Sequence, residues 1–255
     1  MTYTIQAACH CHPGYVRQNN EDNFLFGDLS LQERNAGLSR PLTLTADTIN
    51  RCSLAVFDGM GGEALGETAA FIGARTLYAA LLHSPCDSDG DFSRDTVERM
   101  NQAVWQAAID HSADRMGATV AMLTFRDDHV YTCNLGDSRI FRLRDGKFHQ
   151  LSQDHTDEAF LLSQGIQQQQ PRLTQHLGMD PALFRPEPYV TGFYLQSGDW
   201  YVICSDGLTD MLDPGQIVDT IYNTAEPTLC AQSLVDGALN RGGRDNVTVM
   251  VIRVV

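Results

Sequence analysis

Five short acidic clusters divide this chain, and each lies where an apolar run meets a glycine or asparagine turn. They are Asn20-Glu21-Asp22, Asp58-Gly59-Met60-Gly61-Gly62, Gly136-Asp137-Ser138-Arg139, Asp206-Gly207-Leu208-Thr209-Asp210 and Gly243-Arg244-Asp245-Asn246. Hard divalent cations such as Mg²⁺ and Mn²⁺ need oxygen ligands on rigid supports, and carboxylates at strand ends supply them. The repeated pattern therefore predicts a metalloenzyme whose site is assembled from distant parts of the sequence.

Turn chemistry is the alternative explanation, because Asp-Gly and Gly-Asp pairs are also common in hairpins. It is sufficient for Asp145-Gly146, which separates two short apolar runs, and for any single cluster it is the favoured interpretation. Five clusters together favour the metal site. Residues 54–57 lead directly into Asp58, and residues 201–204 lead in the same way into Ser205-Asp206, as expected where buried strands stop.

Six motifs carry a resemblance to a known family. In order they are Arg17-Gln18-Asn19-Asn20-Glu21-Asp22, Asp58-Gly59-Met60-Gly61-Gly62, Gly117-Ala118-Thr119, Gly136-Asp137-Ser138-Arg139, Ser205-Asp206-Gly207-Leu208 and Asp245-Asn246-Val247-Thr248. This series resembles the metal-dependent (type 2C) protein serine/threonine phosphatases from about Gly14 to the last residue, and the Met60 form resembles the bacterial members. The resemblance implies an α+β fold, a four-layer α-β-β-α sandwich with two central antiparallel sheets. It also implies a single domain over residues 1–255, with an insertion at about 28–50 and a short flap at about 153–178.

Apolar periodicity predicts the main elements independently. Helices are expected over residues 66–83, 93–115 and 228–240. Strands are expected over residues 4–8, 23–26, 54–57, 119–125, 129–135, 139–143, 200–204 and 246–254. Residues 28–50 are polar and weakly patterned, which predicts a loop. Two helices followed by antiparallel hairpins and a late helix indicate sheets covered by helices, whereas the four-layer order follows only from the resemblance.

Composition excludes several classes. The formal charge of −14, from 18 basic and 32 acidic residues, argues against a nucleic-acid partner, because phosphate-backbone binding needs a basic face. The run Cys9-His10-Cys11-His12 is not expected to bind zinc, because alternate residues of a strand point to opposite faces. Seven cysteines without a Cys-x-x-Cys pair favour a reducing compartment. With no secretory or membrane segment, the expectation is a cytoplasmic monomer without membrane partners.

The resemblance assigns metal ligands to individual residues. Asp58 bridges two Mn²⁺ or Mg²⁺ ions, and the Gly59 carbonyl binds one of them. Asp206 and Asp245 complete one shell, while Glu21 and Asp22 serve the other ion largely through water. Two ions that share a water lower its pKa and hold it for in-line attack on phosphorus, so no covalent phosphoenzyme is needed. The catalytic set is then Arg17, Asp58, Asp206 and Asp245.

Three further residues have proposed roles, and two of them, Arg17 and Asp210, also have an alternative interpretation. Arg17 is expected to bind the substrate phosphate, since a guanidinium can hold two phosphoryl oxygens, and the alternative is a surface salt bridge. Asp137 and Asp210, with Asp206, match positions that hold a third, weaker metal in bacterial relatives. Asp210 is alternatively the cap of a following helix.

The chain departs from the family pattern in two places. Met60 replaces the histidine that many animal members have and that is thought to act as general acid, so the leaving oxygen must receive its proton from another source. The flap begins as expected at Gln153-Asp154-His155-Thr156, but it is short and glutamine-rich through residues 167–170. Its run over residues 173–178, Leu-Thr-Gln-His-Leu-Gly, resembles phosphatases that oppose the kinase controlling bacterial type VI secretion.

Three functions remain from different classes. The first is a phosphatase acting on phosphorylated proteins and opposing a Ser/Thr kinase. The second is a catalytically silent pseudophosphatase that binds phosphoproteins, and the intact acids at positions 21, 22, 58, 137, 206, 210 and 245 count against it. The third is a scaffold with incidental Asp turns, which the ordered motifs disfavour. Metal-dependent release of phosphate from a phosphopeptide separates all three.

Overall fold

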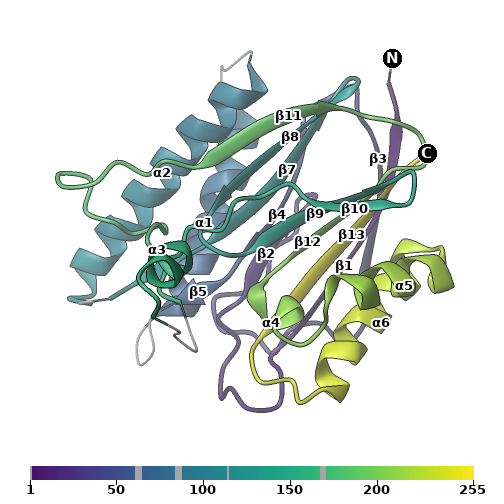
Figure 1. The fold of residues 1–255 in the computed structure, drawn as a ribbon. Helices are drawn as coiled ribbons and strands as arrows, with labels where there is room; N and C mark the ends of the chain where they lie inside the picture. Colours follow the sequence, from purple (N-terminus) through teal and green to yellow (C-terminus); the bar gives the residue numbers. More distant parts are fainter. Residues whose placement is uncertain (1, 61–64, 84–87, 114, 167–170) are drawn as a thin grey trace.

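Two antiparallel sheets form the centre of the molecule (Figure 1). The structure is a computed structural model that describes residues 2–60, 65–83, 88–113, 115–166 and 171–255. The first sheet has the order β10 (Lys147–Gln150), β9 (Arg139–Arg144), β12 (Trp200–Cys204), β13 (Val247–Val254), β1 (Thr4–His12) and β3 (Leu42–Asp47). The second sheet has the order β11 (Tyr189–Tyr194), β8 (His129–Leu135), β7 (Val120–Arg126), β4 (Cys52–Phe57) and β2 (Asn23–Phe26). A short pair, β5 (Gly59–Met60) with β6 (Gly117–Ala118), extends beyond the end of β4.

Helices cover the outer face of each sheet, as Figure 1 shows. The second sheet is covered by α1 (Gly66–His83) and α2 (Asp89–Asp110). The first is covered by α4 (Asp206–Thr209), α5 (Pro214–Thr224) and α6 (Pro227–Asn240). The short α3 (Glu158–Ser163) belongs to neither layer. The predicted α+β sandwich of two antiparallel sheets with flanking helices is therefore confirmed.

Three apolar clusters hold the layers together. One lies between the sheets and includes Cys9, Cys11 and Tyr201. The others lie between each sheet and its helices. Alternation along β1 decides which residues enter which cluster, since Ala8 joins the cluster under α6 whereas Cys9 and Cys11 face the opposite sheet. His10 and His12 are thus directed to the side of α6, away from the two thiols.

Helix α2 begins four residues before its predicted start. The Ser88 side chain accepts a hydrogen bond from the Asp91 backbone N–H, and Asp89 and Asp91 lie in the first turn, where the helix dipole favours negative charge. Its buried face contains Val97, Met100 and Val104, as the helical spacing predicted. The helix ends at Asp110, five residues before the predicted end.

Several elements are absent from the sequence prediction. They include β3, which lies inside the expected loop 28–50, β10, β11, α3 and α5, besides the short β5, β6 and α4. The first three are edge strands, whereas the fourth edge strand, β2, was predicted. Edge strands are stabilised largely by backbone pairing with one neighbour, so their side chains need not form an apolar run. At β3, alternate residues are partly buried, and the strand pairs along Thr4–Cys9 of β1.

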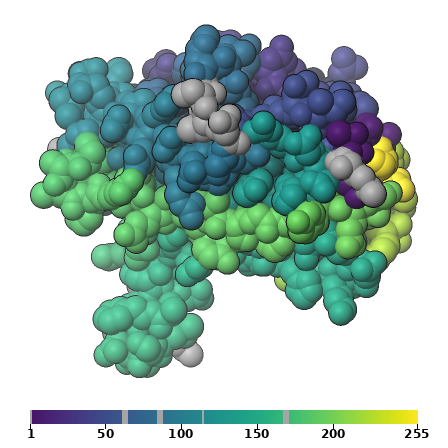
Figure 2. Space-filling model, turned by 90° about the horizontal axis from the view of Figure 1, so that it is seen from above, coloured from purple at the N-terminus to yellow at the C-terminus, as the bar shows by residue number. Residues whose placement is uncertain are grey.

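The flap projects from the body around α3 in the space-filling view (Figure 2). No residue of α3 is buried, and Phe160 and Leu162 are exposed. The predicted Asp145-Gly146 hairpin turn joins β9 to β10 with both residues at positive φ, +50° and +75°, as a type I′ turn requires. Gly61, Gly62 and residues 167–170 lie outside the described residues. Within the described ranges, no helix has the length and apolar character needed to cross a membrane.

Candidate active site

Seven of the nine predicted site residues line one cavity of about 240 Å³ at the end of the sandwich. They are Arg17, Glu21, Asp58, Gly59, Asp137, Asp206 and Asp245. Asp210 lines an adjacent cavity of about 380 Å³, which shares Arg17, Asp137, Asp206 and Asp245 with the first. Asp22 interacts electrostatically with Asp58 and Asp206. The structure thus brings together carboxylates from all five acidic clusters.

Asp58 occupies the electrostatic centre of this group. It follows the last residue of β4, and its backbone is fixed on both sides by Thr119, whose N–H donates to the Asp58 carbonyl (2.8 Å) and whose Oγ1 accepts from the Asp58 N–H (3.1 Å). The Thr119 hydroxyl also bonds to the Ser138 hydroxyl (2.7 Å). Burial, followed by the charges of Asp206, Asp22, Asp137 and Asp245, raises the pKa of Asp58 well above its ordinary value.

Asp22 is the most buried of the site carboxylates, with 1% of its surface exposed. Its Oδ2 accepts hydrogen bonds from the hydroxyls of Ser205 (2.8 Å) and Thr248 (2.6 Å). Its Oδ1 is buried and has no hydrogen-bond partner among the described residues. Burial raises the pKa of Asp22 to about 7 against the opposing effect of these two hydroxyls. A buried carboxylate oxygen without a donor is a position where a cation is favourable.

Asp206 begins α4, directly after β12. Burial raises its pKa to about 8, and the charges of Asp137, Asp245, Asp210 and Asp22 act in the same direction. Asp210 does not cap a following helix, because it ends α4 and its N–H donates to the Asp206 carbonyl (2.8 Å). The capping alternative is therefore wrong, since Asp213 supplies the N-cap of α5.

The donor set fits hard divalent cations. Carboxylates in this density repel one another, and a bound Mn²⁺ or Mg²⁺ would remove both the repulsion and the unpartnered Asp22 oxygen. Among the described residues, no three or more His, Cys, Asp or Glu side chains are arranged so that they could hold a metal ion by themselves. Asp245 is paired with Arg17 instead. Binding would therefore need Asp245 to reorient, with water and backbone oxygens completing the shells.

Arg17 contacts a predicted metal ligand and lines both cavities. Its Nη2 lies 2.5 Å from Asp245 Oδ2, while 54% of its side chain remains exposed and lines both cavities. The hydrogen bond to Asp245 is the largest effect on its pKa, which is raised. The salt bridge that was the alternative interpretation is present, and it joins Arg17 to a predicted metal ligand. The phosphate-binding role stays a prediction.

Asn246 was not predicted as a site residue, yet it positions the segment that contains Arg17 and Glu21. Its Oδ1 accepts from the Glu21 N–H (2.7 Å), and its Nδ2 donates to the carbonyls of Pro13 (2.8 Å) and Asn19 (2.9 Å). One buried amide thus ties the loop before β2 to the start of β13. The only signal in the sequence was its place beside Asp245 in the last motif.

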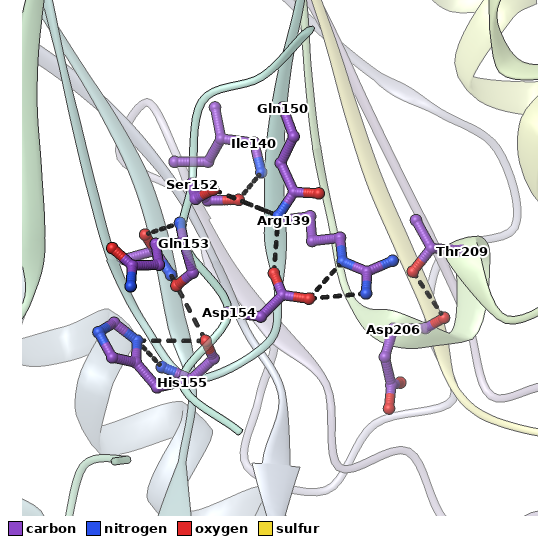
Figure 3. Close-up of polar contacts among 11 residues, drawn as sticks. Arg139, Ile140, Gln150, Ser152, Gln153, Asp154, His155, Asp206 and Thr209 are labelled. Atoms are coloured by element: carbon purple, nitrogen blue, oxygen red, sulfur yellow. Dashed lines mark hydrogen bonds and ion pairs between the residues drawn. The ribbon is translucent and has the colours of Figure 1, made fainter. Parts of the chain in front are cut away.

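A second set of unpredicted contacts fixes the root of the flap (Figure 3). Arg139 donates from Nε (2.9 Å) and Nη2 (2.7 Å) to one oxygen of Asp154, whose other oxygen accepts from Gln150 (2.7 Å). The N–H of His155 donates to the Gly136 carbonyl (3.0 Å), and the Gly136 N–H donates to His155 Nδ1 (3.2 Å). The flap therefore starts from the loop that carries Asp137.

Gly207 permits the close approach that places Asp206 beside Asp245. A Cβ at Gly207 would lie 2.0 Å from the Asn246 carbonyl oxygen, so α4 would have to move away from β13. We expect Gly207→Ala to lower the free energy of unfolding by about 1–3 kcal/mol and kcat by about tenfold. Thermal unfolding and steady-state kinetics measure both. Gly90→Ala is the control, because its Cβ meets nothing closer than 3.8 Å, and equal losses in both variants would contradict the argument.

Comparison with known proteins agrees with this site. A family model described as Protein phosphatase 2C matches residues 43–237. The chain is 30% identical over 273 aligned positions to the serine/threonine protein phosphatase PstP of Mycobacterium tuberculosis, covering 100% of this chain and 46% of the relative. It therefore spans about half the length of PstP. It is 29% identical over 213 positions to protein phosphatase PhpP of Streptococcus pneumoniae, covering 79% of this chain and 85% of PhpP.

Solved structures give the same family over the full length. PppA, a key regulatory component of T6SS in Pseudomonas aeruginosa, has a TM-score of 0.79 at 26% identity, with 100% of both chains covered. The catalytic domain of PstP in complex with two manganese ions has a TM-score of 0.79 at 28% identity, also with 100% of both chains covered. With the family model spanning most of its length and the acidic motifs in one cavity, the chain belongs to the protein phosphatase 2C family.

Proposed function

We propose that this chain is a metal-dependent phosphoprotein phosphatase that hydrolyses phosphoserine and phosphothreonine. The observation that carries the proposal is one cavity lined by Arg17 and by carboxylates from all five acidic clusters, Glu21, Asp58, Asp137, Asp206 and Asp245, with the more deeply buried Asp22 beside them. When bound, two Mn²⁺ or Mg²⁺ ions would supply an activated water and neutralise phosphoryl charge. Asp58, Asp206 and Asp245 would hold them directly, with Glu21, Asp22 and the Gly59 carbonyl.

Arg17 would bind the phosphoryl group from the open side of the cavity. Its guanidinium has five N–H donors, and the contact with Asp245 is made through Nη2. The remaining donors can reach phosphoryl oxygens while the side chain stays anchored, or the side chain can release Asp245 to a cation. Either arrangement places positive charge against the oxygens on which charge develops.

Met60 lines the same cavity and has no proton to donate. The leaving serine or threonine oxygen must therefore be protonated by another group or by water. Asp137 and Asp210, with Asp206, are proposed to hold a third, weaker ion, because they surround the adjacent cavity of about 380 Å³. Asp154 and Glu158 of the flap root also line that cavity, so the flap root adjoins the residues that would hold this ion.

The partners follow from the family and remain proposals. They are phosphorylated proteins, together with the Ser/Thr kinase whose action the enzyme would reverse. The similarity to PppA over the whole chain supports a role in regulating type VI secretion. A single cytoplasmic domain over residues 1–255, acting as a monomer, is the arrangement we propose for this activity.

Phosphate release from phosphopeptides tests the proposal. We expect phosphoserine and phosphothreonine peptides to be hydrolysed with added Mn²⁺ or Mg²⁺, and activity to be lost in excess EDTA and restored by excess Mn²⁺. A phosphotyrosine peptide of the same sequence is the control for residue specificity. Full activity in EDTA would contradict the metal assignment. Binding of the peptides without release at any metal concentration would instead identify a catalytically silent phosphoprotein-binding protein.

A further inference from the structure

A cavity of about 680 Å³ lies on the outer face of β1, apart from the cavities of the candidate active site. Its walls come from the end of β1, Tyr15 in the loop that follows, the loop at residues 36–39, and α6. The residues that give it chemical character are His10, His12, Tyr15, Leu38, Asp236 and Leu239. None of these belongs to the predicted catalytic set.

His10 lines the base of β1 in this cavity as a neutral ring. Only 4% of its surface is exposed, and its Nδ1 is buried without a hydrogen-bond partner among the described residues. Burial lowers the pKa of His10, an effect that Asp236 opposes and His12 reinforces, so the ring is neutral near pH 7. The ring therefore adds no positive charge to the cavity wall near pH 7.

His12 and Tyr15 form an aromatic wall. The Nδ1 of His12 accepts a hydrogen bond from the Gly14 N–H (2.9 Å), so this nitrogen is unprotonated and the ring is neutral in this arrangement. Burial likewise lowers the pKa of His12. The two rings meet edge to face at a centroid distance of 5.8 Å and an angle of 79°. Tyr15 is otherwise 68% exposed, so its ring is available to a bound group.

Asp236 supplies negative charge from the opposite wall. Its carboxylate acts on both histidines, raising the pKa of each against the larger effect of burial. Gln232 donates to one of its oxygens (3.0 Å) and so orients the carboxylate on the helix. Leu38 and Leu239 add apolar surface. The cavity thus combines a carboxylate, neutral imidazole rings, a tyrosine ring and aliphatic contacts.

The loop wall is held firmly against β1. The Leu38 N–H donates to the Cys11 carbonyl (2.8 Å), and Gly37 has φ +75° with a Cβ position only 2.4 Å from that same oxygen. Only glycine allows this approach without displacing the loop. The cavity is therefore built by specific backbone contacts.

We propose that this cavity receives an arginine or lysine side chain of the phosphoprotein substrate. The inference rests on the proposed phosphatase function and extends it to a substrate class, proteins with a basic residue near the phosphorylated one. The aliphatic stem would pack on Leu38 and Leu239, and the cationic head would lie between Asp236 and the Tyr15 ring. The chain's formal charge of −14 also favours a basic partner.

The backbone connects this cavity to the candidate active site. Tyr15 precedes Arg17 by two residues, and the Tyr15 N–H donates to the carbonyl of Gly243 (2.7 Å), which itself precedes Asp245 by two residues. Two residues of extended chain span at most about 7 Å. The Cα atoms of Tyr15 and Arg17 are therefore at most about 7 Å apart, and the arginine position that reaches the cavity is found by scanning both sides of the phosphorylated residue.

The test uses phosphothreonine peptides with one arginine moved from four residues before the phosphothreonine to four residues after it, in a neutral background. Each is compared with the same peptide carrying neutral citrulline in place of arginine. We expect at least one position at which arginine raises kcat/KM by about five- to tenfold. Asp236→Asn should reduce that ratio to within about twofold of one. Hydrolysis of p-nitrophenyl phosphate should be unchanged, because Asp236 lies outside the catalytic cavity.

Asp219→Asn is the matched control, since it removes one exposed carboxylate from α5 outside the cavity and should keep the arginine preference. The inference is overturned if the arginine preference is absent at every position, or if it is equal in wild type and Asp236→Asn. Turnover of p-nitrophenyl phosphate in the same experiment would still support the phosphatase activity. If that turnover is absent with Mn²⁺, the proposed function fails. Fluorescence anisotropy with the same labelled peptides then decides the cavity's role, with weaker binding of arginine peptides to Asp236→Asn supporting it and equal binding refuting it.

Discussion

Asp58→Asn is expected to lower kcat by a factor on the order of 10²–10³ at saturating Mn²⁺. Asp58 interacts electrostatically with Asp206, Asp22, Asp137 and Asp245, so its carboxylate is the one best placed to be shared by two ions. An asparagine keeps the shape but removes the charge. Steady-state kinetics with a phosphopeptide over a range of Mn²⁺ concentrations measures the effect.

The same variant should keep its fold. Asp58 is a charged group placed among like charges, so in the metal-free protein its replacement by a neutral residue relieves repulsion. We expect the Tm of metal-free Asp58→Asn to be no lower than that of wild type, and the rise in Tm on adding Mn²⁺ to be smaller, because binding to the folded state is weakened. Asp219→Asn serves as the control for loss of one charge. If Asp58→Asn kept more than about a tenth of wild-type kcat, a loss under ~1.4 kcal/mol, Asp58 could not be the bridging ligand.

Arg17→Ala is expected to lower kcat/KM for a phosphopeptide by about 10²-fold, with KM raised and kcat reduced. The phosphoryl group would lose a guanidinium that binds it in the ground state and, more strongly, as charge shifts during transfer. Arg17→Lys should recover little, because a point charge cannot reproduce the two-pronged contact.

The structure adds a second expectation for Arg17. In the metal-free protein the Arg17 Nη2 donates a hydrogen bond to Asp245 Oδ2. A cation that binds Asp245 through this oxygen must therefore displace Arg17. Mn²⁺ affinity of Arg17→Ala should therefore be equal to or higher than that of wild type, which calorimetric titration measures. A variant that lost Mn²⁺ affinity, or that kept its kcat/KM, would show that Arg17 is structural and that the metals alone bind the phosphate.

Most residues of the candidate site could be predicted from the sequence, because each acid lies in a short motif beside an apolar run. Each acid follows or precedes an apolar strand, so its place at the end of the sandwich follows from the strand itself, as Asp58 after β4 and Asp206 after β12 show. Alternation along β1 also decided correctly that Cys9 and Cys11 point away from His10 and His12. Such patterns are fixed by covalent geometry, which every strand obeys.

Contacts between distant segments were decided only by the tertiary structure. Arg17 meets Asp245 across 228 positions of sequence, and the Asn246 amide joins that same loop to β13. Neither pairing leaves a trace in local periodicity. The edge strands β3, β10 and β11 were missed for a related reason, because their stability comes from pairing with a neighbour more than from their own apolar pattern. The sequence by itself thus determined which residues could do the chemistry, while packing of the two sheets determined which partners each one meets.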